Sequence, residues 1–228
     1  MARGDLNGAG KMDSPAKFID HTLLKADATN LEIAALCEEA VEHGFASVCV
    51  SPVFVAQASR LLYGSDVAVC TVVGFPLGSQ TTEVKVFEAH QAIASGADEI
   101  DMVIHLGAAR VFDYKAVGAE IRKVIAASDQ ALVKVIIECC LFDTAVKTRL
   151  VEAVVASGAD YVKTSTGFAD SGATLEDVRL LCRVAAGRIK VKAAGGIRDW
   201  QACQSMLNAG AGRIGTSAGV AIMRQWRN

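Results

Sequence analysis

Two lysines stand where apolar, β-branched segments of the chain end: Lys163 follows Tyr161 and Val162, and Lys192 follows Val191. Burial disfavours the charged form of an ammonium group, and so does a second cation nearby. A pair of interior lysines is therefore a physical route to a neutral, nucleophilic amine near neutral pH. The chemistry that this pattern predicts is imine (Schiff-base) formation with a carbonyl substrate.

Short β-branched segments of this kind recur between helical patterns along the whole chain. The segment from Asn30 to Gly44 has helical punctuation, and at Thr174 a capping hydroxyl precedes Asp177 by three positions. Eight strands are expected, at residues 18–21, 47–50, 67–73, 99–104, 132–138, 161–164, 189–193 and 213–215.

A repeat decides how these strands assemble. Glycine ends a helical pattern just before a strand at Gly44, Gly96, Gly158 and Gly210, at intervals of 52, 62 and 52 residues. Each interval holds two strand–helix units, which favours eightfold construction over an open sheet of five or six strands. The predicted fold is a single-domain α/β protein, a (β/α)8 TIM barrel over residues 15–228, preceded by a flexible tail over residues 1–14.

Composition supports one core and excludes several classes of partner. The chain has 228 residues, 52% of them hydrophobic, and a formal net charge of −2, so no global field would attract nucleic acid or an anionic membrane. The apolar runs are too short to span a bilayer. Seven cysteines without a C-x-x-C pair indicate free thiols in a reducing compartment, although adjacent Cys139 and Cys140 also fit a redox or metal pair.

In such a barrel the active site forms at the carboxyl ends of the strands. Asp101, Lys134, Lys163 and Lys192 fall within or near the ends of predicted strands four to seven, so the four charges are expected to converge in one mouth. The alternative is that some of these lysines point outward and reach solvent along the helices.

Two small-residue turns lead into helices after strands seven and eight: Gly195 to Arg198, and Gly215 to Gly219. Backbone N–H groups and helix N-termini hold phosphate at this place in many barrels. A small phosphorylated metabolite is the predicted ligand.

The remaining polar candidates indicate no metal. None of the four histidines has a zinc-ligand spacing. His21 and His105 lie near strand ends, where they either line the mouth or make ordinary hydrogen bonds. Glu138 is expected to end the fifth strand and to pair with a lysine.

Six motifs together resemble the deoxyribose-phosphate aldolase family, from about Ile19 to Ser217. They are Ile-Asp-His-Thr-Leu-Leu from Ile19, Gly-Phe-Pro-Leu-Gly from Gly74, Gly-Ala-Asp-Glu-Ile-Asp-Met-Val from Gly96, Val-Lys-Thr-Ser-Thr-Gly-Phe from Val162, Ala-Gly-Gly-Ile-Arg from Ala194 and Arg-Ile-Gly-Thr-Ser from Arg213.

The resemblance implies a class I aldolase that reversibly cleaves 2-deoxy-D-ribose 5-phosphate to D-glyceraldehyde 3-phosphate and acetaldehyde, without metal or organic cofactor. It implies that Lys163 forms the imine, that Lys192 lowers its pKa and assists proton transfer, and that Asp101 shuttles protons through a water. The other implied contacts are to substrate through Thr22, Cys49, Lys134 and Thr164, and to phosphate through Gly167, Gly196, Gly215 and Ser217.

The resemblance further implies a homodimer that serves deoxynucleoside catabolism in the cytoplasm. Two positions depart from the family pattern, His105 in place of asparagine and Ala218 in place of a second serine, and altered efficiency or substrate preference is expected from them. Two other readings share some of these features: another metal-free Schiff-base aldolase, transaldolase-like or acting on keto acids, and a non-catalytic sugar-phosphate-binding barrel.

Overall fold

A computed structural model describes residues 14–227, so most of the predicted tail lies outside the described residues. Eight parallel strands close into a barrel in chain order, with β1 hydrogen-bonded to both β2 and β8. The predicted (β/α)8 fold is confirmed. The strands are β1 Ile19–Leu23, β2 Ser47–Val50, β3 Ala68–Val73, β4 Glu99–Val103, β5 Leu132–Ile136, β6 Tyr161–Lys163, β7 Lys190–Ala194 and β8 Arg213–Thr216.

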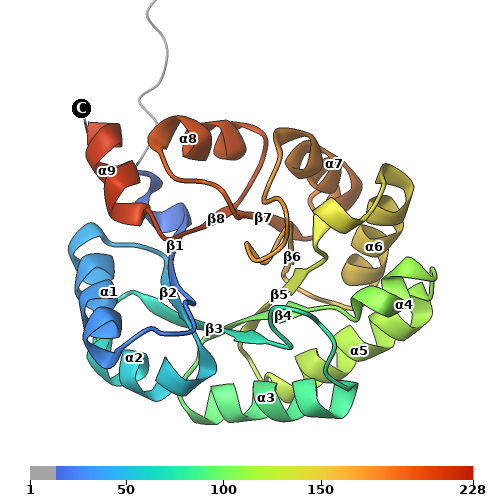
Figure 1. The fold of residues 1–228 in the computed structure, drawn as a ribbon, viewed down its shortest axis with the longest axis horizontal. Helices are drawn as coiled ribbons and strands as arrows, with labels where there is room; N and C mark the ends of the chain where they lie inside the picture. The colour runs from blue at the N-terminus through green and yellow to red at the C-terminus, as the bar shows by residue number, and fades with distance from the viewer. Residues whose placement is uncertain (1–13, 228) are drawn as a thin grey trace, which may run out of the picture.

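Helices surround the barrel as an outer ring (Figure 1). They are α1 Asn30–His43, α2 Val55–Leu61, α3 Thr82–Ala94, α4 Leu106–Arg110, α5 Tyr114–Ala127, α6 Thr144–Ala156, α7 Leu175–Ala185, α8 Trp200–Asn208 and α9 Gly219–Arg227, with short 3-10 helices η1 Pro15–Phe18, η2 Pro52–Phe54 and η3 Cys139–Leu141. Within residues 14–227, no helix has the length and apolar character needed to cross a membrane.

Local sequence accounts for the helix boundaries. Thr29 begins α1 with a capping box to Glu32, and the Thr174 hydroxyl accepts from the Asp177 N–H to begin α7. The four repeat glycines all have φ between +69° and +106°, a left-handed conformation that glycine adopts without a Cβ clash. The repeat seen in the sequence is therefore a repeat of helix endings.

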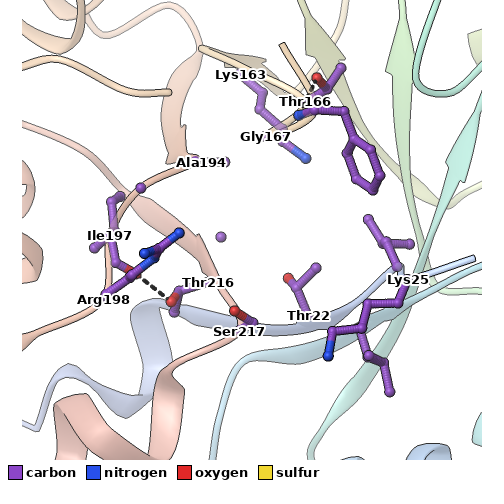
Figure 2. Close-up of a pocket in the computed structure, with 16 residues that line it drawn as sticks. Thr22, Lys25, Lys163, Thr166, Gly167, Ala194, Ile197, Arg198, Thr216 and Ser217 are labelled. Carbon is purple, nitrogen blue, oxygen red and sulfur yellow. Dashed lines mark hydrogen bonds between the residues drawn. The ribbon is translucent and has the colours of Figure 1, made fainter. Parts of the chain in front are cut away.

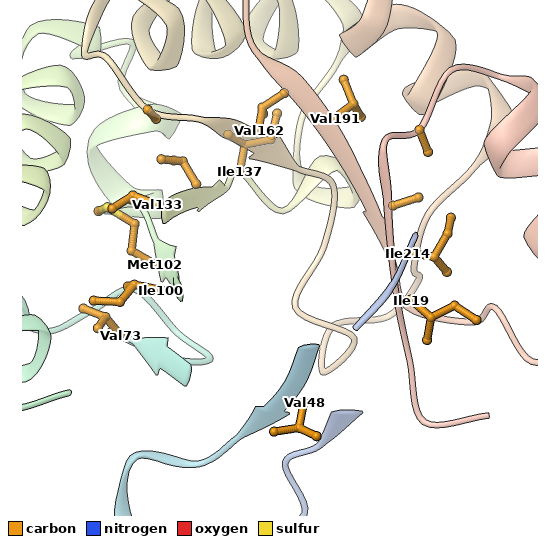
Figure 3. Packing of buried hydrophobic residues seen from close by; sticks show 14 of the residues in the cluster. Ile19, Val48, Val73, Ile100, Met102, Val133, Ile137, Val162, Val191 and Ile214 are labelled. Atoms are coloured by element: carbon orange, nitrogen blue, oxygen red, sulfur yellow. The ribbon is translucent and has the colours of Figure 1, made fainter. Parts of the chain in front are cut away.

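Strand alternation separates an apolar outer layer from a charged interior. Ile19, Val133 and Ile214 belong to the cluster packed between sheet and helices (Figure 3). Their sequence neighbours Asp20 and Lys134 point the other way and bond across the inside of the barrel. The hydrophobic core thus lies between the strands and the helices, and the interior is free to carry chemistry.

Two predicted strand ends differ from the structure by two residues, and the other strand boundaries differ by at most one. β5 ends at Ile136 instead of Glu138, because Glu138 turns into the left-handed region with φ +50°. β1 runs on to Leu23, past the predicted end at His21.

Candidate active site

Asp101 on β4 joins three lysines from the next three strands. Its Oδ2 lies 2.7 Å from both the Lys163 and the Lys192 Nζ, and its Oδ1 lies 3.0 Å from the Lys134 Nζ. The pairing of neighbouring strands brings these groups together, because Asp101 is opposite Lys134 and Lys163 is opposite Lys192. The predicted convergence of the four charges therefore holds, and the outward-pointing alternative does not.

A second set of charges lies beside the first. Glu99 contacts Lys134 at 2.6 Å and Arg213 at 3.1 Å, while Asp20 bonds Lys192 and lies 2.6 Å from Arg213. The sequence interpretation missed Asp20, Glu99 and Arg213. Their alternation with apolar neighbours was the available signal, but it does not tell which strands share a layer.

The carboxylates keep most of this network ionised. Burial opposes ionisation of Asp101, yet the ammonium groups of Lys134, Lys163 and Lys192 hold the pKa of its carboxyl well below the usual range. Burial likewise favours a neutral Lys192, but the carboxylates of Asp101 and Asp20 outweigh it and raise the pKa of Lys192. Lys192 is therefore held as a cation close to Lys163, with the carboxylate of Asp101 between the two ammonium groups.

Above the network lies a cavity of about 240 Å³. Lys163 projects into it from β6 and is the member of the charged set that reaches its wall (Figure 2). The lining comes from the carboxyl ends of β1, β6, β7 and β8 and from the loops that follow them: Thr22, Leu23, Leu24, Lys25, Lys163, Thr166, Gly167, Phe168, Ala194, Gly195, Gly196, Ile197, Arg198, Gly215, Thr216 and Ser217.

Two exposed cations in this wall received no role from the sequence. Arg198 and Lys25 flank the cavity in Figure 2, with Ser217 and Thr22 between them. Arg198 ends a predicted phosphate turn, so its charge there was a signal that could have found it, whereas Lys25 directly follows the Ile19–Leu24 motif and had no such signal. The cavity therefore combines one interior lysine with a cationic rim.

Some predicted site residues reach the cavity and others do not. Thr22, Gly167, Gly196, Gly215 and Ser217 line it. Cys49, Lys134 and Thr164 are at most 1% exposed and lie outside its wall. Lys134 is engaged with three carboxylates, and the Thr164 hydroxyl donates to the Ala194 carbonyl.

Three polar residues from the sequence interpretation have structural partners instead. The ring of His21 lies 2.7 Å from a Glu39 oxygen outside the barrel, and the Nδ1 of His105 accepts from the Ala108 N–H to cap α4. The expected pairing of Glu138 with a lysine is wrong, because both of its oxygens accept from Thr166.

One group within residues 14–227 has metal-ligand types in reach of each other. Atoms of Cys49, Cys70 and Asp101 lie within 4.8 Å of one another. The surroundings do not suit a cation, because three ammonium groups already occupy the oxygens of Asp101.

The DeoC/LacD family aldolase model matches residues 16–226. The chain belongs to this aldolase family. The deoxyribose-phosphate aldolase of Syntrophotalea carbinolica is 58% identical over 216 residues, which are 95% of this chain and 98% of that protein. The deoxyribose-phosphate aldolase of a Geobacillus species is 56% identical over 209 residues, which are 91% of this chain and 94% of that protein.

Solved aldolases share the fold over almost the whole chain. The deoxyribose phosphate aldolase from Aeropyrum pernix superposes with a TM-score of 0.89 at 36% identity, covering 96% of this chain and 94% of that one. A protein described as QR15, an aldolase, gives a TM-score of 0.91 at 42% identity, with 95% and 97% covered. The resemblance found in the sequence motifs is thus confirmed, and the chain is a lyase of this family.

Proposed function

We propose that this aldolase reversibly cleaves 2-deoxy-D-ribose 5-phosphate to D-glyceraldehyde 3-phosphate and acetaldehyde through an imine on Lys163. The observation that carries the proposal is the position of Lys163, whose Nζ faces the cavity while contacting Asp101 at 2.7 Å. The other members of the charged network lie beneath the cavity wall. Lys163 is therefore the amine that a substrate carbonyl meets.

The bond changes follow from imine chemistry. The neutral Lys163 nitrogen attacks C1 of the open-chain sugar, and water leaves as the protonated imine forms. Loss of the C3 hydroxyl proton breaks the C2–C3 bond, releases glyceraldehyde 3-phosphate and leaves an enamine, because the imine nitrogen takes up the electron pair. Protonation at C2 and hydrolysis of the imine then release acetaldehyde and restore the amine.

Asp101 and Lys192 are the proposed proton carriers. One oxygen of Asp101 accepts from both Lys163 and Lys192, so a proton that leaves Lys163 meets an acceptor already joined to a second ammonium group. Lys192 stays charged because Asp101 and Asp20 stabilise its ammonium form, and it offers a proton to the substrate through a water. Lys134, which also contacts Glu99, donates to the other oxygen of Asp101.

The phosphate is proposed to bind at the glycine-rich rim beside Arg198. Gly167 and Gly196 have φ of +84° and +80°, which leaves their backbones open to close approach. Gly215 and Ser217 complete this side of the cavity ahead of α9. Backbone N–H groups and one guanidinium are a chemically suitable set for a dianion.

Borohydride trapping tests the proposal directly. Incubation with acetaldehyde and sodium borohydride should leave one reduced two-carbon adduct, mapped by mass spectrometry to Lys163. The adduct should be absent in Lys163→Ala and retained in Lys115→Ala, which removes an exposed lysine on α5. If folded wild-type protein traps no specific adduct, the imine mechanism is wrong and a non-catalytic sugar-phosphate-binding barrel is the better interpretation.

We also propose that the enzyme is a cytoplasmic homodimer. All seven cysteines are free thiols, as a reducing compartment requires. Large apolar side chains are exposed on α1, η2, the β3–α3 loop and α3, namely Leu31, Val53, Leu77 and Phe87. The Aeropyrum pernix aldolase is described as a unique tetramer.

Light scattering should give twice the 23.9 kDa chain mass. Phe87→Glu should lower the mass to that of one chain, whereas Phe112→Glu, with the same 64% exposure in the loop between α4 and α5, should not. A single-chain mass for the wild type would contradict the proposal.

A further inference from the structure

Glu138 is a buried carboxylate without a cation. Its residue is 2% exposed, yet no Lys, Arg or His within residues 14–227 lies within ion-pair distance. Both of its oxygens accept from Thr166 instead: the backbone N–H lies 3.2 and 3.3 Å away, and the hydroxyl donates to Oε2. A buried carboxylate is costly unless its hydrogen bonds are satisfied, so the contact with Thr166 needs an explanation.

The backbone of Glu138 is also unusual. Its φ of +50° and ψ of +69° place it in the left-handed region, which non-glycine residues seldom adopt and which persists where the surrounding structure enforces it. Two backbone hydrogen bonds flank it: the Ile137 N–H donates to the Lys163 carbonyl at 3.1 Å, and the Cys139 N–H donates to the Thr164 carbonyl at 2.8 Å. The turn after β5 is therefore hydrogen-bonded to the end of β6 and to the residue that follows it.

Thr166 connects the turn after β5 to the cavity wall. Its hydroxyl accepts from the Phe168 N–H at 3.1 Å, so the loop bends around the side chain that Glu138 holds. Thr166, Gly167 and Phe168 all line the cavity, whereas Glu138 does not (Figure 2). Glu138, which lies outside the cavity, thus fixes the position of the wall on this side.

The loop after β6 also packs against the glycine turn after β7. A Cβ on Gly195 would lie 2.8 Å from the Gly172 Cα and 3.4 Å from the Gly167 Cα, and the Ala173 N–H donates to the carbonyls of Ala194 and Gly195. A shift of the loop after β6 would consequently displace the turn after β7. Both turns belong to the rim at which phosphate is proposed to bind.

We propose that Glu138 is a positioning residue for phosphate recognition. It holds Thr166 in place and thereby sets the spacing between the loop after β6 and the glycine turn after β7 that a phosphate group requires. This inference rests on the proposed function, since it assigns the phosphate of the substrate to that rim. The Glu138 side chain does not line the cavity, and its hydrogen bonds go to Thr166 rather than to Lys163, so its effect should be confined to the phosphorylated end of the substrate.

The test compares 2-deoxyribose 5-phosphate with unphosphorylated 2-deoxyribose in Glu138→Gly and Glu138→Gln. Glycine accepts the left-handed backbone but lacks the carboxylate, and glutamine keeps one acceptor oxygen. For Glu138→Gly, the KM for the phosphorylated sugar and the Kd for inorganic phosphate should both rise roughly tenfold. The kcat/KM for the unphosphorylated sugar should stay within about twofold of wild type, and Glu138→Gln should recover most of the loss.

A second pair of variants covers the case in which Glu138→Gly fails to fold. Thr166→Val removes the hydroxyl at nearly constant volume, and Thr166→Ser keeps it, so only the valine variant should show the rise in KM and in the Kd for phosphate. An equal loss on both sugars, or no change on either, would overturn the inference.

Failure of the proposed function is distinguishable from failure of this inference. If the proposed function is wrong, wild-type protein will trap no acetaldehyde on Lys163. The Kd for inorganic phosphate would still report whether Glu138 positions the rim.

Discussion

Lys192 and Arg198 are six positions apart in the chain and lie in opposite surroundings. Lys192 is 1% exposed on β7, and its ammonium group contacts Asp20 and Asp101. Arg198 is exposed on the following loop and forms no ion pair within the described part of the chain. The barrel therefore holds Lys192, a proposed proton carrier, on a strand between carboxylates, and Arg198, proposed to bind phosphate, on a loop without an ion-pair partner in the described residues.

Because of this difference, the two regions should respond differently to mutation. A change in the charged interior removes a partner from buried groups and affects stability and catalysis together. A change at the rim leaves the core intact and affects affinity for one part of the substrate.

The strongest challenge to this division is Asp101→Asn. Removing the charge that three lysines share should lower kcat by roughly 10²–10⁴. It should also lower the free energy of unfolding by about 3–5 kcal/mol, because buried ammonium groups lose their partner. Urea unfolding and steady-state kinetics measure the two effects.

Glu99→Gln is the matched control. It disturbs the same network at Lys134 and Arg213 but leaves the Asp101 contact with Lys163 in place. Its stability should fall while its kcat falls much less. An equal loss of kcat in both variants would mean that the network acts only as a structural support.

At the rim, Arg198→Ala should raise the KM for 2-deoxyribose 5-phosphate roughly tenfold, since charge-assisted hydrogen bonds to a phosphate are lost. The unphosphorylated sugar should be unaffected. Lys25→Ala, on the other side of the cavity, should show a smaller rise, because Arg198 lies beside the glycine turns. A larger effect of Lys25→Ala would move the phosphate to the β1 side of the mouth.

Between about pH 5 and pH 9, the pH dependence of stability should come from side chains outside the barrel and not from its charged interior. Burial lowers the pKa of His21 although Glu39 opposes it, so stability should fall as the pH drops below about 6.5, where the unfolded histidine gains a proton. The depressed pKa of Asp101 and the raised pKa of Lys192 keep their contribution constant from about pH 5 to pH 9.

On the alkaline side, burial raises the pKa of the Cys37 thiol to about 11, so stability should decline above about pH 8.5, where unfolded thiols ionise. Urea midpoints measured across this range should therefore be flat between about pH 7 and 8.5. His21→Gln should flatten the slope between about pH 5 and 6.5, and His90→Gln, at an exposed site, should not. A retained slope in His21→Gln would show that His21 is not the group whose protonation destabilises the fold in this range.

The smallest effect is expected from His105→Asn. His105 lies outside the cavity lining, and its ring caps α4, a role that asparagine also fills. The family pattern predicted altered efficiency at this position, but because the ring lies outside the lining the KM should be unchanged, and stability should shift by less than about 1 kcal/mol. A clear change in KM would show that the loop after β4 contacts substrate; Ala218, which also lies outside the lining, can be compared as Ala218→Ser.

The sequence was sufficient for the fold and for the group Asp101, Lys163 and Lys192. Helix-ending glycines gave the eightfold repeat, and charged residues at apolar strand ends gave the convergence. Partners within the interior were not predictable, because contacts such as Asp20 with Arg213 join strands far apart in the chain. Glu138 was assigned to a strand because its sequence environment is β-branched, and only tertiary contacts enforce its left-handed turn.

The contact between Gly172 and Gly195 has a consequence for redesign of the substrate range. A Cβ placed on Gly172 would lie 2.2 Å from the Gly195 carbonyl oxygen, so neither position accepts a side chain without moving the other loop. Libraries aimed at new aldehydes should therefore leave this pair untouched and vary Phe168, whose exposed ring meets Phe75 edge-on at 5.2 Å. The two loops are packed as a single unit, so a library that varies Phe168 changes the cavity without changing the contact that joins them.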